Sequence, residues 1–386
     1  MSVEIEHGFL MDEIFLKEKE FADLHHVEVC NVSHWNSSAQ FQNEIMRVME
    51  LPEPFPIWDY YYTYNINQLD RVKLLERFGL PKEKVSSRAI LLTQSSTLSI
   101  MNIAKFIKRA GFKRVCILRP FYFSVSYSLD SFHVNYEYED IVWVDGNPQI
   151  PIDIIQSKQY DAIWLTSPVF CIGARYSQLQ LDHLAALMRQ GILVISDESL
   201  ALPGHELIRH FAGHECFWAI YSPHKAISIQ GLKFSAIVYP KRYDDFLEQW
   251  IDVISGALSP SNCNAIFHYL SDNFLLCYQA YENYIHTSKK KIEKIANSFS
   301  NIDFIRNTHG HYITLFFKDL NQANTDSISF FEKLIANASS SFLPGYFHGF
   351  PDALGFCFRI NLTLRHADLI SSVGRIAQFL SHYKEY

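Results

Sequence analysis

Lys225 stands in a stretch that otherwise has the composition of a protein interior. The tetrapeptide SPHK (222–225) follows the apolar run FWAIY (217–221) and precedes AISI (226–229). Lysine is rarely buried without a partner, and a desolvated lysine amine loses its proton more easily and attacks carbonyl carbons. Two interpretations are therefore open: Lys225 ends a strand and extends its amine to solvent, or it is the nucleophile of an active site.

Three hydroxyl residues follow another apolar run. After AILLT (89–93) the chain continues QSSTLSI, so Ser95, Ser96 and Thr97 stand where a helix begins. Hydroxyls, free N–H groups and the positive end of a helix suit an anion such as phosphate. The alternative is that Ser96 or Thr97 is an ordinary N-cap residue.

Three further groups stand at or near the ends of apolar runs. Tyr122 follows RVCIL (114–118), and an aromatic ring there could stack on a flat ligand. Asp197 follows ILVIS (192–196), where a carboxylate is costly to bury unless it meets a partner. Lys233, eight residues after Lys225, is a second cation near the expected anion site. The combination fits pyridoxal phosphate, whose chemistry needs a lysine imine and an acid at the pyridine nitrogen.

The elements that must position these residues are short apolar runs that alternate with segments of helical periodicity. Continuous apolar strands between helices predict a mostly parallel sheet covered on both faces, which binds ligands beyond the carboxyl ends of its strands. We therefore expect an α/β fold with a seven-stranded sheet and a smaller α+β domain. The seven expected strands are 89–93, 114–118, 134–138, 162–166, 192–196, 217–221 and 234–239.

The chain divides into three parts by its pattern. Residues 1–50 are expected to form an N-terminal segment that packs on the small domain and the active site, and 51–245 a large cofactor-binding domain. Residues 246–386 are expected to form a linking helix and a small C-terminal domain, with helices at 274–299, 327–338 and 366–382 and strands at 312–317 and 356–363.

Composition excludes several classes of protein. The 386 residues carry a net charge of −7 and form no large basic cluster, which argues against a general nucleic-acid surface. No apolar stretch reaches the ~20 residues of a membrane helix, and the acidic N-terminus does not resemble a signal peptide. The seven cysteines are scattered and form no CxxC motif. We expect a protein with reduced thiols in the cytoplasm.

These motifs resemble those of the aminotransferase superfamily, the fold-type I pyridoxal-phosphate enzymes, over roughly residues 30–386. Its S-x-x-K motif matches Ser222 and Lys225, which implies that Lys225 forms the imine and Ser222 contacts the phosphate. Its D-E-x-Y motif matches DESL, which implies that Asp197 pairs with the pyridine nitrogen. The resemblance further implies roles for Ser95, Ser96, Thr97 and Lys233 at the phosphate, for Tyr122 on the ring, and for Arg359 of FRINLT at the substrate carboxylate.

Two positions depart from the family pattern. The motif N-P-x-N-P-T-G is SPVFCIG (167–173) here, so Phe170 replaces the asparagine that binds the phenolic oxygen of the cofactor. Leu200 replaces the tyrosine that shares this task. Because both donors lower the pKa of the imine, their loss predicts a more basic imine unless other groups replace them.

The resemblance implies an enzyme that acts at Cα of an amino acid. The first hypothesis is an aminotransferase, and the second is elimination or cyclisation of a hydroxylated arginine-like substrate. The second rests on a similarity to a subgroup that acts on arginine and hydroxyarginine, carried by NVSHW (31–35), the SST loop, Lys233 and the segment 342–366. In that interpretation His34 could reach the active site. The family is usually homodimeric, and DYYYTYN (59–65) is the segment expected to reach the cofactor of the partner.

Other functions stay open. Glu198, Glu206 and Asp352 could receive a guanidinium group. A zinc site is a further alternative. Histidines on a solvated helix face account for the same pattern better, so we expect no metal. A binding protein that retains the fold without chemistry is another. The residues of the zinc alternative are His205, His210, His214, Glu206 and Cys216.

Overall fold

The computed structural model describes residues 3–51, 68–245, 247, 258–306, 308–318, 320, 328–350 and 355–383. The chain forms two compact units. The larger unit comprises 46–170 and 174–279, and the smaller unit comprises 1–45, 171–173 and 280–386. The three-part division expected from the sequence stays a prediction.

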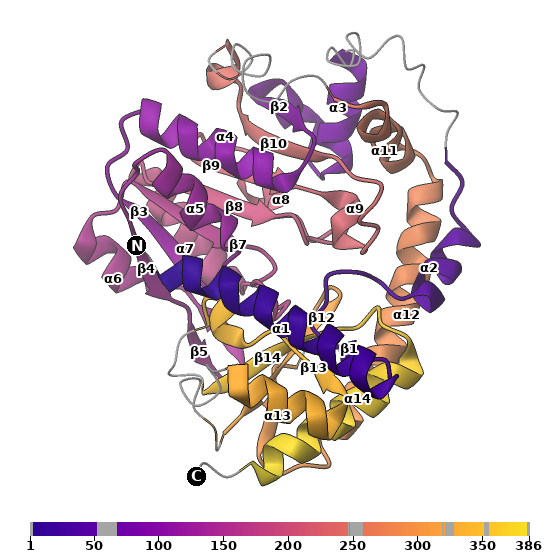
Figure 1. The fold of residues 1–386 in the computed structure, drawn as a ribbon. Coiled ribbons are helices and arrows are strands. Elements are labelled where there is room, and N and C mark those ends of the chain that lie inside the picture. The colour runs from indigo at the N-terminus through magenta and orange to yellow at the C-terminus, as the bar shows by residue number, and fades with distance from the viewer. Residues whose placement is uncertain are drawn as a thin grey trace. The chain divides into compact units, whose positions relative to one another are not determined.

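A seven-stranded sheet forms the centre of the larger unit (Figure 1). Its order is β2-β10-β9-β8-β7-β3-β4; β10 is antiparallel to both neighbours and the other pairs are parallel. The expected α/β fold with a mostly parallel sheet is thus confirmed, and β7 and β9 are buried throughout, as strands covered on both faces must be. The strands are β2 (Arg88–Thr93), β3 (Val115–Arg119), β4 (Tyr136–Asp140), β7 (Ala162–Thr166), β8 (Leu193–Glu198), β9 (Phe217–Tyr221) and β10 (Ser235–Pro240).

One strand lies later in the chain than its apolar run suggests. The expected strand at 134–138 is β4 at Tyr136–Asp140, because residues 136–140 pair with β3 from Val115 to Arg119. Val134 is still buried, but its backbone amide turns back to the carbonyl of Leu129. The apolar character of this position therefore reflects burial in a turn and not a place in the sheet.

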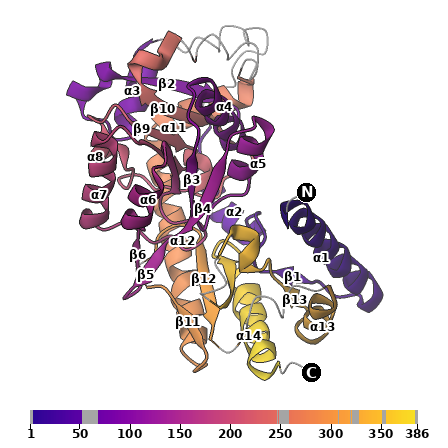
Figure 2. The ribbon, with the colours of Figure 1, turned by 90° about the vertical axis from the view of Figure 1, so that its left-hand side faces the viewer.

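Helices cover both faces of this sheet. Figure 2 shows α4 (Ser96–Arg109) and α5 (Ser124–Ser131) on one face and α7 (Gln178–Arg189) and α8 (Ile208–Phe211) on the other. Apolar residues of α4 recur at helical spacing, and Phe106 stacks on Trp218 with ring centroids 4.2 Å apart. The remaining elements of this unit are α3 (Gln68–Arg77), the 3₁₀ helices at Lys82–Ser87 and Lys241–Tyr243, β5 (Val142–Val144), β6 (Asn147–Gln149), α6 (Ile152–Lys158), α9 (Pro223–Ala226), α11 (Pro260–Leu270) and the start of α12 (Asn273–Ala296).

The topology brings several segments to one edge of the sheet. Because β10 is antiparallel to both β2 and β9, strand β2 runs in the same direction as β9, β8 and β3. The carboxyl ends of these four strands therefore share an edge, and the segment that enters β10 shares it too. Lys233 lies in that entering segment, two residues before Ser235.

The smaller unit has an antiparallel sheet of β11 (Ile302–Phe304), β12 (Tyr312–Phe317) and β14 (Phe356–Asn361). Helices α13 (Ile328–Ala338) and α14 (His366–His382) and the end of α12 contribute to its core, where Phe342 stacks on Phe358 at 4.2 Å. The unit also contains α1 (Val3–His25), β1 (Cys30–Asn31), which pairs with β13 (Ser340–Ser341), most of α2 (Ala39–Met46) and a 3₁₀ turn at Gly345–His348.

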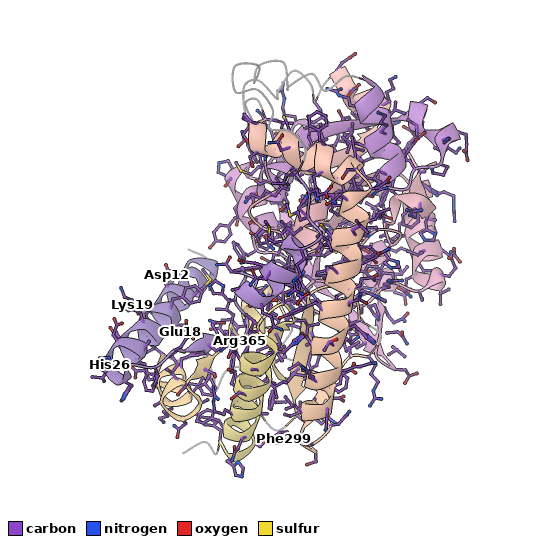
Figure 3. The ribbon with its side chains drawn as sticks, turned by 90° about the vertical axis from the view of Figure 1, so that its right-hand side faces the viewer. Asp12, Glu18, Lys19, His26, Phe299 and Arg365 are labelled. Atoms are coloured by element: carbon purple, nitrogen blue, oxygen red, sulfur yellow. The ribbon has the colours of Figure 1, made fainter. Side chains whose placement is uncertain are left out.

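Helix α1 is attached to the smaller unit by a buried carboxylate. Glu18, labelled on α1 in Figure 3, accepts hydrogen bonds from Asn31 Nδ2 at 2.8 Å and from Ser341 Oγ. Burial raises the pKa of Glu18, and these two donors oppose the increase. On the surface Lys17 forms an ion pair with Glu332 of α13 at 3.1 Å. Among the described residues, no helix is both long enough and apolar enough to cross a membrane.

Candidate active site

Lys225 lies in a single helical turn that follows β9. Pro223 begins this turn, since its fixed φ suits the first position of a helix. Lys225 is half-buried, and its Nζ lies 3.4 Å from Ser96 Oγ and 4.7 Å from the centre of the Tyr122 ring. No carboxylate among the described residues pairs with the amine. The structure thus places the Lys225 amine against a hydroxyl and an aromatic face, and it does not extend freely into solvent.

The start of α4 offers unpaired donors. Ser95, and not Ser96 or Thr97, is the N-cap residue, and its side chain accepts a hydrogen bond from the amide of Leu98 at 3.3 Å. The amides of Ser96 and Thr97 have no hydrogen-bond acceptor among the described residues. Because α4 has 14 residues, its positive end reinforces these donors.

Two further groups at the same edge suit an anion. Ser222 is 4% exposed, and within the described ranges its Oγ has no hydrogen-bond partner. A buried hydroxyl without a partner is costly, so a ligand oxygen at this position would stabilise it. Lys233 is exposed, and no described residue pairs with its ammonium group. An anion could therefore meet a cation, a hydroxyl and helix amides at this edge.

Asp197 is a buried carboxylate at the end of β8, the strand beside β9. It is 3% exposed, and its Oδ1 accepts a hydrogen bond from the amide of Ser199 at 3.0 Å. Within the described part of the chain no cation pairs with it. A carboxylate in this setting is stabilised by a charged N–H donor, and a protonated ring nitrogen is such a donor.

Phe170 and Leu200, which depart from the family motifs, are both buried in the larger unit at 3% and 8% exposure. The ring of Phe170 lies 5.9 Å from that of Tyr122, so it extends the aromatic wall beside Lys225. Neither side chain can donate a hydrogen bond. The structure therefore gives the two departures an apolar role in packing.

These observations fit pyridoxal phosphate. The amine of Lys225, the uncompensated carboxylate of Asp197 and the unpartnered hydroxyl of Ser222 are the kinds of group that its aldehyde, ring nitrogen and phosphate require. Tyr122 provides an aromatic face next to the amine.

A buried chain of hydroxyl groups holds this edge together, and no sequence pattern points to it. Ser99 Oγ lies 2.8 Å from Thr93 Oγ1 and 2.9 Å from Ser235 Oγ, and Ser235 donates to the carbonyl of Tyr221 at 2.8 Å. The chain therefore joins β2, α4, β10 and β9. Its members are far apart in the sequence and have ordinary residue types, so only the fold reveals them.

Arg359 lies in the smaller unit, on β14. Its side chain is fully buried, and its guanidinium carbon lies 3.6 Å from the ring centre of Trp35 and 4.4 Å from that of Tyr312. Nε and Nη2 donate to the carbonyl of Ser33 at 3.3 and 3.0 Å, and Nη1 contacts Cys171 Sγ at 3.6 Å. No carboxylate of the described residues pairs with this buried cation.

His34 lies near Arg359 in the same unit. Its Nδ1 accepts a hydrogen bond from the amide of Asn36 at 3.0 Å, and its carbonyl accepts one from Asn361 at 2.9 Å. Burial lowers the pKa of His34, and the charge of Arg359 lowers it further. A neutral imidazole is therefore expected beside Arg359 at neutral pH.

The predicted site residues thus fall in two groups. Arg359 and His34 belong to the smaller unit. The tyrosine segment 59–65 lies outside the described residues, as does Asp352. The other predicted residues belong to the larger unit, and they are Ser95, Ser96, Thr97, Tyr122, Asp197, Ser222, Lys225 and Lys233.

The other acidic candidates are used inside the fold. Glu198 accepts a hydrogen bond from the amide of Leu207 at 2.7 Å, and burial raises its pKa well above the usual range. Glu206 pairs with Arg209 at 2.8 Å. Within the described ranges, no cluster of three or more His, Cys, Asp or Glu side chains could hold a metal ion. The zinc alternative for His205, His210 and His214 therefore finds no support in the structure.

No protein-family model matches the chain, and no curated protein matches it in sequence. Solved structures do match its fold. The enzyme YbdL from Escherichia coli, which has a methionine aminotransferase function, is 14% identical with a TM-score of 0.70, over 95% of this chain and 97% of that one.

Two other solved structures are similar to the chain over most of its length. Cystalysin from Treponema denticola, which contains pyridoxal 5′-phosphate, is 16% identical with a TM-score of 0.67 over 92% of each chain. MppP, whose crystals were soaked with its product 2-ketoarginine, is 14% identical with a TM-score of 0.66, over 91% of this chain and 99% of that one. Identities this low establish the architecture alone. The chain therefore has the fold that these enzymes share.

Proposed function

We propose that the chain binds pyridoxal phosphate through Lys225 and acts as an aminotransferase-like enzyme on an amino acid. The observation that carries this proposal is the position of the Lys225 amine, against Ser96 and Tyr122, at the edge where Asp197 is buried without a cation. The fold supports it, because similar structures include an aminotransferase and an enzyme that contains this cofactor.

The site residues of the larger unit have different tasks in this proposal. When bound, pyridoxal phosphate withdraws electrons from the bond to hydrogen at Cα of the substrate. Lys225 Nζ carries the cofactor, and as a free amine it accepts and returns the proton of Cα. Asp197 keeps a proton on the ring nitrogen, and Tyr122 covers the face of the ring. The amides at the start of α4, Ser222 Oγ and Lys233 Nζ bind the phosphate.

We propose that Arg359 binds the carboxylate of the amino acid. A fully buried guanidinium without an acidic partner is costly, and its contacts with the rings of Trp35 and Tyr312 repay only part of that cost. A substrate carboxylate would supply the missing charge through two parallel hydrogen bonds. This requirement favours amino acids over simple amines.

Elimination or cyclisation of a hydroxylated arginine-like substrate is the second candidate. Phe170 and Leu200 remove two hydrogen-bond donors that ordinary aminotransferases retain, and both are packed as apolar residues here. The similar fold of MppP, an enzyme with a ketoarginine product, is compatible with a substrate of this class. The two candidates share the cofactor and differ in what happens after proton removal.

Absorption spectroscopy tests the shared part of the proposal. Addition of pyridoxal phosphate to the purified protein is expected to give a band in the visible or near-ultraviolet range that survives gel filtration. Lys225→Ala is expected to lose the band, and Lys113→Ala, which replaces an exposed lysine of the same unit, is expected to keep it. Absence of the band in the wild type would overturn the proposal.

Mass spectrometry of the products separates the two candidates. A panel of amino acids is first screened for a spectral change of the bound cofactor, and the products of those that respond are then identified. A keto acid formed together with transfer of the amino group to an added keto acid indicates transamination. A product that has lost water and keeps the amino nitrogen, or a keto acid formed with release of free ammonia, indicates elimination or cyclisation. We also propose a homodimer, as the resemblance implies, and sedimentation equilibrium measures this directly.

A further inference from the structure

We infer that Asn262 is a positioning residue of the anion site. It holds the loop before α4 and the segment that carries Lys233 in place relative to each other. This inference rests on the proposed function, because it concerns the phosphate of the cofactor. Asn262 lies in the first turn of α11 and is 7% exposed. It was not among the residues predicted from the sequence.

The side-chain amide of Asn262 joins three segments of the larger unit. Its Nδ2 donates to the carbonyl of Lys233 at 2.7 Å and to the carbonyl of Gln94 at 3.4 Å. Its Oδ1 accepts from the amide of Ser259 at 3.0 Å and from Ser259 Oγ at 2.7 Å. Because a backbone amide can only donate and a carbonyl can only accept, this environment fixes which end of the amide is oxygen and which is nitrogen.

The two carbonyls lie where the sheet no longer connects their segments. Strands β2 and β10 pair as far as Thr93 and Ser235, which form the last rung of the ladder. Gln94 follows this rung on one strand and leads directly to Ser95 and the start of α4. On the other strand Lys233 precedes the rung by two residues. Asn262 therefore continues the connection between the two strands beyond the point where backbone pairing ends.

This connection places the amides at the start of α4 and the cation of Lys233 relative to each other. The amides of Ser96 and Thr97 lie at the start of α4, and the ammonium of Lys233 lies in the segment before β10. A phosphate bound here must meet both segments at once. Without Asn262 the Lys233 segment has one fewer contact with the loop before α4. Positioning groups act in this way, because ordering the segments before the ligand arrives reduces the entropic cost of binding.

Few other side chains can make these four hydrogen bonds. An aspartate would keep both acceptor bonds to Ser259 but would place a carboxylate oxygen against the carbonyls of Lys233 and Gln94. An alanine would lose all four bonds. The alternative role for Asn262 is simply to cap α11, since Asn262 and Ser259 form a capping box.

Ser259→Ala separates these two roles. It removes the hydroxyl that accepts from the amide of Asn262 at 3.2 Å and donates to its Oδ1, which weakens the helix cap. It leaves the bonds from Asn262 Nδ2 to Gln94 and Lys233 in place. If Asn262 acts only as a cap residue, Ser259→Ala and Asn262→Ala must have the same effect on phosphate binding.

The test compares two aldehydes that differ only in the phosphate. Dissociation constants of pyridoxal phosphate and of pyridoxal are measured by absorption for the wild type, Asn262→Ala, Asn262→Asp and Ser259→Ala. We expect Asn262→Ala to reduce the preference for the phosphate ester by about threefold to tenfold, the range of one or two hydrogen bonds. Asn262→Asp is expected to reduce it more, and Ser259→Ala to leave it unchanged.

Two further arms make every outcome informative. In the background of Lys233→Ala the effect of Asn262→Ala is expected to shrink, because the two residues act on the same phosphate. Inorganic phosphate is expected to raise the thermal midpoint of the wild type more than that of Asn262→Ala. If Asn262→Ala does not fold, Asn262→Asp carries the same comparison, since it keeps the helix cap.

The inference and the proposed function fail in different ways. An unchanged preference for the phosphate ester in Asn262→Ala and Asn262→Asp overturns the inference while Lys225 still binds both aldehydes. If the wild type attaches neither aldehyde, the proposed function fails, and the inorganic phosphate arm alone then decides on Asn262. Equal losses of the preference for the phosphate ester in Ser259→Ala and Asn262→Ala would also overturn the inference, because they would assign Asn262 to the helix cap.

Discussion

Lys225 and Arg359 are two cations without an acidic partner among the described residues, and their surroundings differ sharply. Lys225 is half-buried, has a single 3.4 Å hydrogen bond to Ser96 and lies over the ring of Tyr122. Arg359 is fully buried against two rings, and two of its nitrogens bind one carbonyl. The first cation is loosely held and the second is fixed.

This difference matches two kinds of task. A lysine that carries a cofactor and moves a proton must change its bonds and its charge, so tight pairing with an acid would oppose its chemistry. A guanidinium that only recognises a carboxylate gains from a fixed orientation, because less entropy is lost when the ligand arrives. The contrast therefore supports a reacting group in the larger unit and a recognising group in the smaller unit.

Replacement of Arg359 is expected to have the largest effect on selectivity. Arg359→Gln should lower kcat/KM for amino acids by about a hundredfold, since it removes charge-assisted hydrogen bonds to the carboxylate. The same variant should still bind the cofactor at Lys225. Steady-state kinetics with an amino acid and with the amine that lacks its carboxylate measure the effect. Arg365→Gln, at an exposed ion pair with Asp368, is the control.

Equal losses for the amino acid and the amine would contradict the role of Arg359. So would loss of the cofactor band in Arg359→Gln, because it would assign the residue to the fold of the protein and not to recognition.

The turn that carries Lys225 is supported by a neutral pair of histidines, and acid should weaken it. His224 Nε2 and His268 Nδ1 are 2.9 Å apart and fully buried; burial, with a further contribution from His268, lowers the pKa of His224 to about 3. In the unfolded chain the two histidines have the ordinary pKa of about 6.5 and take up protons below it, whereas the buried pair does not. The free energy of unfolding therefore falls as the pH decreases below about 6.5. His224 alone should lower the free energy of unfolding by about 2 kcal/mol at pH 5.

Urea unfolding at pH 7.5 and pH 5 measures this loss. A double variant, His224→Phe with His268→Phe, keeps two rings in contact with Phe274 and removes both imidazoles. It should lose less stability between the two pH values than the wild type does. The same pH dependence in both proteins would show that other groups control the loss.

Trp35 tests how Arg359 is fixed. Trp35→Leu removes the ring that lies 3.6 Å from the guanidinium carbon, and a desolvated contact of this kind is worth about 1–2 kcal/mol. We expect KM for the amino acid to rise by about tenfold with little change in kcat. Trp143→Leu, in the larger unit, is the matched control. A fall in kcat with unchanged KM would indicate that Trp35 has another task.

Phe170 tests the basicity of the imine, with the smallest expected effect. Phe170→Asn restores a hydrogen-bond donor beside Tyr122, and stabilisation of the phenolate should lower the pKa of the imine by up to about one unit. A pH titration of the absorption band measures this pKa. Phe170→Leu removes the ring without adding a donor and should leave the pKa unchanged. An unchanged pKa in Phe170→Asn would mean that another group already binds the phenolic oxygen.

The sheet and the site residues that follow its strands could be predicted from the sequence. Alternating apolar runs and helices have local signals, and the rule that parallel strands end at one edge places Lys225 and Ser96 together. The structure has them 3.4 Å apart. A resemblance between short motifs was sufficient for the fold type, even though no family model matches the chain.

The supporting residues could not be predicted in this way. Asn262 and Ser99 have ordinary types and no periodic signal, and their partners Lys233, Gln94 and Ser235 come from distant parts of the chain. The rings around Arg359 belong to Trp35 and Tyr312, and no local sequence pattern connects these residues with β14. Such contacts depend on tertiary packing, which one sequence does not reveal.

Chemical trapping of the cofactor tests the central claim most directly. The protein is loaded with pyridoxal phosphate and reduced with borohydride, which converts an imine into a stable amine, and its peptides are identified by mass spectrometry. We predict one modified lysine, Lys225, in the peptide that contains SPHK (222–225). Modification of Lys233 or another lysine in place of Lys225, or no modification, would contradict the account.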